Sequence, residues 1–359
     1  MERFVLSLLT SSLTMTAVAF VYMLLSKVLR EHWSAKWRYY TWVLIFAGFV
    51  MPYNPSIGKA AVNINMYGQL WRTVEGGNEY YVLPDNYFDI FPMIFLIFLI
   101  WVLGTVLFMA KILIEQQLFV RSVKRLSYSV DEKTKELTDG LSDELLIWQG
   151  VKAVRLNGIT TPMMIGFFTP TIILPKENYS EEELRLIIKH ELMHFKNRDL
   201  FIKAFMLIAQ AVNWFNPFLR LFLKKAQQEC EIYCDERVMS GETEYHKRLY
   251  CQTILNTALN SAKADVSLRP VLSSNFNIGG EGLKQRLKTI LSVKKKYRLG
   301  IICGIVAVMI VLTGTVFAFS ENNDDIEYYG DFTEYFSATS LDNDPVSTTT
   351  FSTSYVDIY

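Results

Sequence analysis

Residues 180–194 of this chain read Ser-Glu-Glu-Glu-Leu-Arg-Leu-Ile-Ile-Lys-His-Glu-Leu-Met-His, and the rest of the chain is organised around them. Ser180 followed by Glu183 is a capping-box pattern, which marks the start of a helix. The apolar residues that follow recur at helical spacing and predict a buried face. They are Leu184, Ile187 and Ile188. The sequence therefore predicts a helix from Ser180 to about Asp199.

This helix carries two histidines four residues apart, His190 and His194. Residues at that separation share one helix face, so both rings can point at a single site. Neutral imidazoles in this arrangement suit Zn²⁺, and Glu191 can act as general base toward water that the metal activates. The alternative is a helix with two structural histidines. The remaining histidines, His32 and His246, are expected at the surface.

A second helix is expected after Asn216-Pro217, because Asn caps helices and proline suits their first position. It should run to about Met239 and carry Glu231 and Asp235 on one face. One carboxylate can bind zinc while the other supports a ligand from behind. A solvated acidic surface is the alternative. The preceding apolar stretch, Phe201–Phe215, forms a hairpin with this helix, either packed in the domain or dipping into the membrane.

Long apolar runs predict a membrane protein. Half of the chain (51%) is hydrophobic, and charge-free runs approach or reach the length that crosses ~30 Å of hydrocarbon. We expect spans at residues 4–25, 39–53, 90–110 and 299–319. These divide the chain into residues 1–114, with three spans and an external loop at 54–89, a middle domain at 115–298, a fourth span at 299–319 and a tail at 320–359. The tail is acidic, rich in Ser and Thr, and expected to be disordered.

Charges beside the spans predict the orientation, although the net charge is zero. Basic residues crowd the first loop and both ends of the middle domain, and positive flanks face the cytoplasm. The amino terminus and the tail are therefore expected outside, with the middle domain in the cytoplasm. A signal peptide is the rival interpretation of residues 4–25, since Ala17-Val18-Ala19 resembles a cleavage site. The run is long for such a peptide, and Glu2 weakens the required positive start.

The middle domain also contains strand signals. Residues 115–150 indicate mostly polar helix, whereas Val151–Leu156 alternates as a strand does. Thr169–Leu174 is a further strand, either an edge strand that holds an extended substrate or an ordinary core strand. Cys230 and Cys234, four apart on one helix, could in principle bind metal. Reduced structural thiols are expected instead, since disulfides are rare in the cytoplasm.

These motifs together resemble the bacterial BlaR/MecR-type membrane metallopeptidases. The resemblance rests on the His-Glu-Leu-Met-His helix, the Asn-Trp-Phe-Asn-Pro-Phe turn at 213–218 and Glu-Ile-Tyr-Cys-Asp-Glu at 231–236. Gly-Phe-Phe-Thr-Pro-Thr-Ile-Ile-Leu-Pro at 166–175 is similar too. It covers about residues 1–320 and implies four transmembrane α-helices with a cytoplasmic α+β zincin domain of the gluzincin type.

The resemblance also implies roles for single residues. Zinc would be held by His190, His194 and Glu231, with Glu191 as catalytic base and Asp235 supporting a ligand. Relatives sense an external signal and cleave a cytoplasmic transcriptional repressor, sometimes after cutting themselves. The matching self-cleavage region here is Ser274, Asn275 and Phe276. For an oxyanion donor, Tyr233, His246 and Tyr250 are candidates by proximity only, and packing or surface roles are favoured.

The antibiotic-sensing relatives carry an external penicillin-binding domain after the last span, with Ser-x-x-Lys and Lys-Thr-Gly motifs. Neither motif occurs in the tail, and the Ser-x-x-Lys match at Ser292 lies in a basic cytoplasmic stretch. Direct covalent sensing of a β-lactam is therefore not expected. We expect a zinc endopeptidase of the bacterial cell membrane that acts on a repressor, without binding nucleic acid itself, and a homodimer is compatible with this layout. The alternatives are a broad-specificity quality-control protease and a signalling receptor with a structural zinc site.

Overall fold

The computed structural model describes residues 2–29, 33–50, 62–63, 71–75, 78–82, 87–177, 179–263 and 280–292, with short pieces at 304, 306–307 and 317–318. The predicted self-cleavage region lies outside the described residues. So do the predicted tail at 320–359 and most of the predicted fourth span at 299–319. Within the predicted external loop, β2 (Trp71–Glu75) and β3 (Asn78–Val82) form an antiparallel pair, and β1 (Val62–Asn63) pairs in parallel with β8 (Phe317–Ala318).

Three helices correspond to the first three predicted spans: α1 (Glu2–Leu29), α2 (Ala35–Val50) and α3 (Tyr87–Leu126). In the described part of the chain, two stretches are long and apolar enough to cross a membrane, Ser7–Val28 and Phe95–Leu126. α2 has 16 residues, or ~24 Å at 1.5 Å per residue, and does not meet that length. α3 continues past the predicted end at residue 110, so the first part of the expected polar helix belongs to it.

A small sheet forms one layer of the middle domain, with the strand order β4-β5-β7-β6. Its strands are β4 (Tyr128–Ser129), β5 (Lys152–Arg155), β6 (Met163–Ile165) and β7 (Thr171–Leu174). β5 and β7 are parallel, and the other pairs are antiparallel. β7 lies between two partners, so the interpretation of residues 169–174 as an edge strand is wrong, and the edges of the described sheet are β4 and β6. Gly166 has φ +91°, and a Cβ there would meet the Thr169 carbonyl, so the β6–β7 turn requires glycine.

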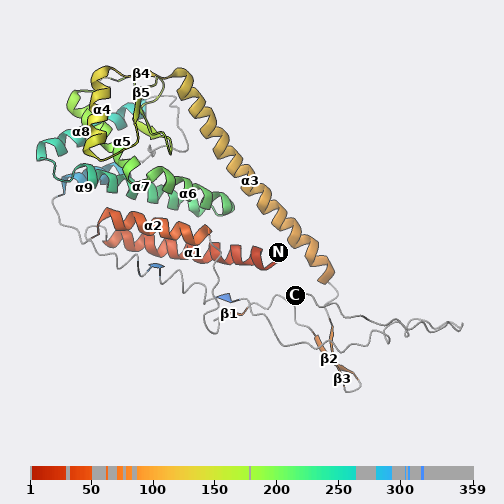
Figure 1. Ribbon diagram of the computed structural model, residues 1–359. Helices are drawn as coiled ribbons and strands as arrows, with labels where there is room; N and C mark the ends of the chain where they lie inside the picture. Colours follow the sequence, from red (N-terminus) through yellow and green to blue (C-terminus); the bar gives the residue numbers. More distant parts are fainter. Residues whose placement is uncertain are drawn as a thin grey trace. The chain divides into compact units, whose positions relative to one another are not determined.

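Six helices of the middle domain are described, and the first two of them pack against this sheet (Figure 1). They are α4 (Glu132–Glu144), α5 (Glu181–Lys196), α6 (Asp199–Val212), α7 (Phe218–Val238), α8 (Glu244–Lys263) and α9 (Gly280–Leu291). The predicted capping box is present at α5: Glu183 N donates to Ser180 Oγ, and Ser180 N donates to the Glu183 carboxylate. α5 packs against β6 and α7, which brings the histidine helix onto the helix of Glu231.

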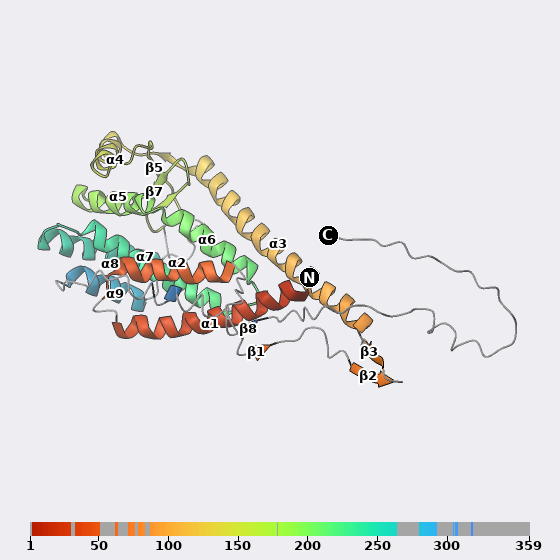
Figure 2. The ribbon, with the colours of Figure 1, turned by 60° about the horizontal axis from the view of Figure 1, so that its bottom comes forward.

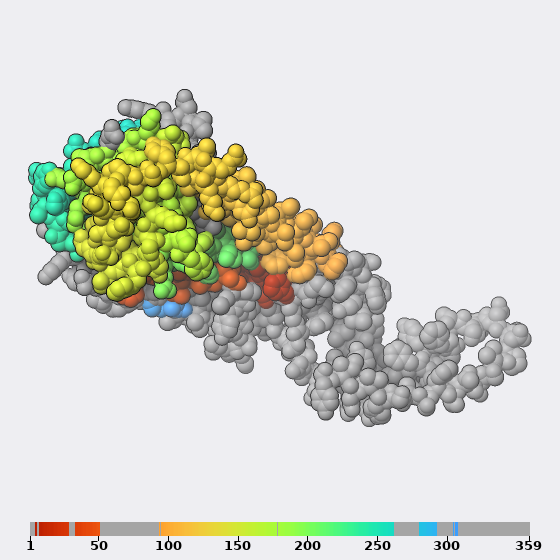
Figure 3. Space-filling view, turned by 45° about the horizontal axis from the view of Figure 1, so that its top comes forward, coloured from red at the N-terminus to blue at the C-terminus, as the bar shows by residue number. Residues whose placement is uncertain are grey.

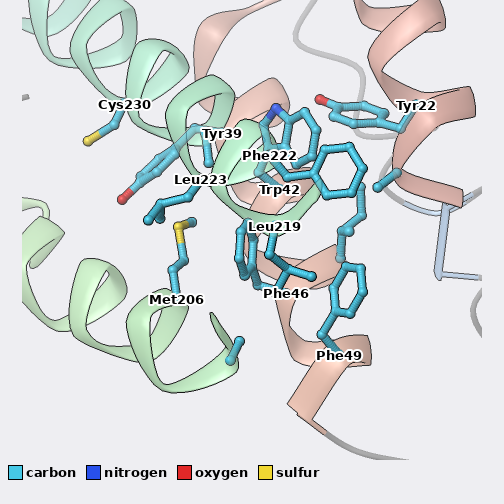
Figure 4. Close-up of a cluster of buried hydrophobic side chains, with 14 of the residues drawn as sticks. Tyr22, Tyr39, Trp42, Phe46, Phe49, Met206, Leu219, Phe222, Leu223 and Cys230 are labelled. Carbon is cyan, nitrogen blue, oxygen red and sulfur yellow. The ribbon is translucent and has the colours of Figure 1, made fainter. Parts of the chain in front are cut away.

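A cluster of buried hydrophobic side chains joins α7 to the amino-terminal helices (Figure 4). Trp42 of α2 stacks on Phe222 of α7, and Tyr22 of α1 meets Trp42 edge to face. All three side chains are buried, and burying an aromatic or large aliphatic side chain stabilises a fold by ~1.5–3 kcal/mol. α7 is therefore held along its length by α2. In Figure 2, α6 lies between α2 and α3, and it packs against both.

Candidate metal centre

His190 and His194 lie on the buried face of α5, because a separation of four residues returns to the same side of a helix. Their Nε2 atoms are 3.1 Å apart. His194 is almost fully buried at 1% exposure, and His190 is 9% exposed. The two rings therefore converge on one point beneath the surface.

Glu231 of α7 completes this convergence from the opposite helix. Its Oε1 lies 3.4 Å from His194 Nε2, and its Oε2 lies 3.5 Å from His190 Nε2. Tetrahedral ligands at ~2.0–2.1 Å from a zinc ion lie ~3.3–3.4 Å from one another. The spacing of the three donor groups and their N/O chemistry therefore fit a zinc ion.

The Nδ1 atom of His194 lies 2.7 Å from Asp199 Oδ2. The carboxylate accepts a hydrogen bond, so Nδ1 carries the proton and Nε2 keeps its lone pair for a metal. Asp199 begins α6 directly after Arg198, whose positive φ of 59° turns the chain back toward α5. Sequence reasoning missed Asp199. Its position five residues after His194, just past the helix end, was the only available signal.

His190 is oriented through a relay of two side chains. Its Nδ1 lies 2.7 Å from Tyr250 Oη, which donates to Asp235 Oδ1 at 2.8 Å. Burial, followed by the charge of Asp235, raises the pKa of Tyr250 well above its usual value, so the phenol keeps its single proton. That proton goes to Asp235, and Tyr250 must accept from His190 Nδ1–H. Tyr250 thus contacts Nδ1 of His190, whereas His194 and Glu231 lie near its Nε2. Asp235 supports His190 through the Tyr250 hydroxyl.

Arg286 of α9 ties the two acidic residues of α7 together. Its Nε and Nη2 atoms lie 2.7 and 2.8 Å from the two oxygens of Asp235, and its Nη1 lies 2.8 Å from Glu231 Oε2. Burial alone raises the pKa of Glu231, but Arg286 and the two histidines outweigh it and hold that pKa well below its usual value. Glu231 is therefore ionised, with Oε1 left toward His194.

Glu191 follows His190 on α5 and is buried at 5% exposure. The other two oxyanion candidates are engaged elsewhere. Tyr233 packs against Tyr39 and Tyr40 of α2, and His246 Nδ1 lies 2.7 Å from a Glu242 carboxylate oxygen. Tyr233 therefore has a packing role, and His246 has a surface role.

A family model named BlaR1 peptidase M56 matches residues 6–290. The chain belongs to this family. It is a peptidase family, and the matched region includes all the residues described above, from His190 to Arg286.

The relatives of this M56 chain include a protein named for regulation and one named for methicillin resistance. It is 27% identical to Regulatory protein BlaR1 of Bacillus licheniformis over 198 residues, which is 54% of this chain and 32% of that protein. It is 25% identical to the Methicillin resistance mecR1 protein of Staphylococcus aureus over 307 residues, or 79% of this chain and 50% of that one. The chain thus spans about half or less of the length of these relatives.

The thiols of Cys230 and Cys234 are further metal-binding groups beside the two histidines of this M56 chain. Cys234 can group with His190 and His194 around one ion, and Cys230 with His194 and Asp199. Burial by itself lowers the pKa of His190, but Cys234 and Glu231 outweigh it and raise this pKa to about 10. Without a metal, a proton therefore competes for His190. The sequence suggested a metal role for these cysteines only as an alternative, and their position beside the histidines keeps that alternative open.

Proposed function

We propose that this chain is a zinc-dependent metalloendopeptidase of the bacterial cell membrane that hydrolyses a cytoplasmic repressor in response to a signal. The observation that carries the proposal is the convergence of His190, His194 and Glu231, at 3.1 to 3.5 Å from one another, with both histidine Nδ1 atoms engaged behind them. A site with oriented histidines and an ionised carboxylate suits a divalent metal.

In this proposal, His190, His194 and Glu231 hold the zinc ion. Zinc would supply Lewis acidity, which polarises a peptide carbonyl and makes water easier to deprotonate. Glu191 takes the proton from water onto its carboxylate and delivers it to the leaving amine, a role typically worth ~10²–10⁴-fold in rate. Asp199, Tyr250 and Asp235 keep both imidazoles in the tautomer that leaves Nε2 free.

The membrane arrangement is part of the proposal. Four spans, with the amino terminus and the tail outside and the peptidase domain in the cytoplasm, agree with the basic flanks of the apolar runs. The bilayer is then a permanent partner. β6 is the outer strand of the described sheet on the side of α5, and in this proposal an extended substrate lies along it. The repressor as substrate rests on the resemblance to the BlaR/MecR-type metallopeptidases.

The test compares the full-length chain with its Glu191→Ala variant, both reconstituted in vesicles. Zinc content is measured in both, together with cleavage of a repressor encoded beside the gene and of an unrelated unfolded protein. We expect equal zinc and loss of repressor cleavage in the variant. Full cleavage by the variant would contradict the catalytic role of Glu191. Equal cleavage of both substrates by the unaltered chain would favour a quality-control protease, and zinc without cleavage would favour a receptor.

A further inference from the structure

The turn that joins α6 to α7 reaches α3 well inside its membrane-length apolar stretch. Trp101 Nε1 donates to the Val212 carbonyl at 2.8 Å, and Trp214 Nε1 donates to the Trp101 carbonyl at 3.3 Å. The Trp214 ring lies over Gly104, where an added Cβ would come within 2.4 Å of it. Glycine thus lets the ring lie directly on the α3 backbone.

The same turn also reaches α1 and α2. Asn216 Nδ2 lies 3.0 Å from Ser12 Oγ and 2.8 Å from Thr16 Oγ1 of α1. Asn213 Nδ2 donates at 2.9 Å to the carbonyl of Phe49, in the last turn of α2. Contacts with all three amino-terminal helices therefore meet at one place.

The positions of these contacts define a depth. Thr16 lies within the stretch Ser7–Val28, and Trp101 lies within Phe95–Leu126. At 1.5 Å per residue, each lies roughly 9–14 Å along its helix from the amino-terminal end of that stretch. Two helices that are separate in sequence thus place the turn at similar depths, ~14 Å along the stretch of α1 and ~9 Å along that of α3. A membrane that both stretches cross therefore contains the turn.

The polar groups of the turn are arranged as such a depth requires, because lipid offers no hydrogen bonds to exposed backbone. The backbone N–H of Asn213 donates to the Ala209 carbonyl, and that of Asn216 donates to the Asn213 carbonyl. The backbone N–H of Phe218 donates to Asn216 Oδ1. The carbonyls of Val212, the last residue of α6, and of Phe49, in the last turn of α2, accept hydrogen bonds from side chains. Among the described residues, one buried side-chain polar atom of the turn, Asn213 Oδ1, has no hydrogen-bond partner.

The outer side of the hairpin is apolar. The chain has no charged residue between Lys203 and Arg220. Three large apolar side chains in that stretch, Ile208, Trp214 and Phe218, are more than a third exposed, and so is Leu221, directly after the exposed Arg220. In Figure 3 the green atoms of α6 reach the surface between the orange α3 and the red first helices. The exposed face of the hairpin is thus continuous with the apolar surface of α3, which suits lipid.

We propose that the α6–α7 hairpin is a re-entrant membrane element, inserted beside α1 and α3 with lipid acyl chains against Ile208, Trp214, Phe218 and Leu221. Glu231 follows the turn by about four helical turns of α7, roughly 20 Å. The metal centre then lies close to the cytoplasmic face of the bilayer, where a substrate must approach along the membrane. The inference rests on the proposed membrane arrangement, in which α1 and α3 cross the bilayer with their amino-terminal ends outside, and it does not require that the site is catalytic.

Photocrosslinking in the full-length chain tests this proposal. The Phe218→p-benzoylphenylalanine variant is reconstituted in vesicles of phosphatidylcholine and phosphatidylglycerol and irradiated. Mass spectrometry then detects phospholipid adducts. Leu103, exposed on α3, is the lipid-facing control, and Tyr245, exposed on α8, is the control away from the membrane. We expect adducts on the acyl chains at 218 and 103 and none at 245.

Adducts at 103 without adducts at 218 would overturn the proposal, and so would their absence at both positions. Equal adducts at 245 would overturn it as well, since the label would then report exposure alone. The same measurement in a Glu191→Ala background separates this proposal from the catalytic one. Lipid adducts at 218 are expected there unchanged, whatever happens to peptide cleavage.

Discussion

Arg286 of α9 holds Asp235 of α7 through two parallel hydrogen bonds of 2.7 and 2.8 Å, while its third nitrogen reaches Glu231. A planar guanidinium matches a carboxylate in this way, whereas a lysine offers a single point charge. α9 thus contributes to the candidate metal centre without providing a ligand to it.

Replacing Arg286 should weaken metal binding. We expect Arg286→Ala to lower zinc affinity ~10–100-fold, the usual effect of losing a group that orients ligands. Arg286→Lys should restore only part of it, because the paired hydrogen bonds are lost. Competition with a chromophoric chelator measures the affinity. Lys284→Ala, at an exposed position of the same helix, is the control, and equal affinity in the Arg286 and Lys284 variants would remove Arg286 from the site.

Tyr250 has two candidate roles, orienting His190 and donating to an oxyanion, and removal of its hydroxyl oxygen distinguishes between them. Tyr250→Phe removes the hydroxyl between His190 and Asp235, so His190 loses its orienting partner, and we expect ~10-fold weaker zinc binding. An oxyanion donor would instead lower kcat and leave zinc affinity unchanged. Zinc titration and steady-state kinetics on one preparation distinguish these results. Tyr245→Phe, at an exposed phenol of the same helix, should change neither.

Zinc affinity should depend on pH through His190. The raised pKa of about 10 means that, in the metal-free folded protein at neutral pH, the imidazole of His190 carries a second proton and a positive charge. That proton stabilises the metal-free fold fully below ~6.5, the usual histidine pKa, and the contribution disappears as pH rises toward 10. Zinc must displace the proton, so apparent affinity should rise with pH by up to ~10-fold per unit for each proton released. Calorimetry in buffers of different ionisation enthalpy counts the protons, and an affinity independent of pH between 6.5 and 8.5 would contradict the expectation.

Gly104 should be intolerant of a side chain. Gly104→Leu must displace the Trp214 ring and break its hydrogen bond to Trp101. We expect ~1–3 kcal/mol of destabilisation, the usual cost of overpacking, seen as a lower unfolding temperature in detergent. Gly140→Ala on α4 is the matched control, since nothing lies within 4 Å of an added Cβ there. It should be neutral or stabilising by up to ~1 kcal/mol. Equal unfolding temperatures for the two variants would argue against close packing of the turn on α3.

Local signals in the chain predicted much of this arrangement. The capping box at Ser180, the four-residue separation of His190 and His194, and the apolar runs follow from helix geometry within a few turns of one segment. Such patterns need no knowledge of distant contacts. The start of α7 beside Asn216-Pro217 was predicted to within one or two residues for the same reason.

Contacts between distant segments could not be predicted in this way. β7 became an internal strand because β6 pairs on its other side, which periodicity within residues 169–174 does not encode. Asp199 reaches His194 only because the chain reverses at Arg198.

The sequence by itself determined a helix with two histidines, a downstream helix with Glu231 and Asp235, and a chain rich in membrane-length apolar runs. Only the tertiary structure decided which groups lie behind the histidines, how Arg286 joins Glu231 to Asp235, and where the α6–α7 turn meets α1 and α3. The physical reason is that helix formation depends on neighbours three or four residues away, whereas these contacts depend on how whole elements pack.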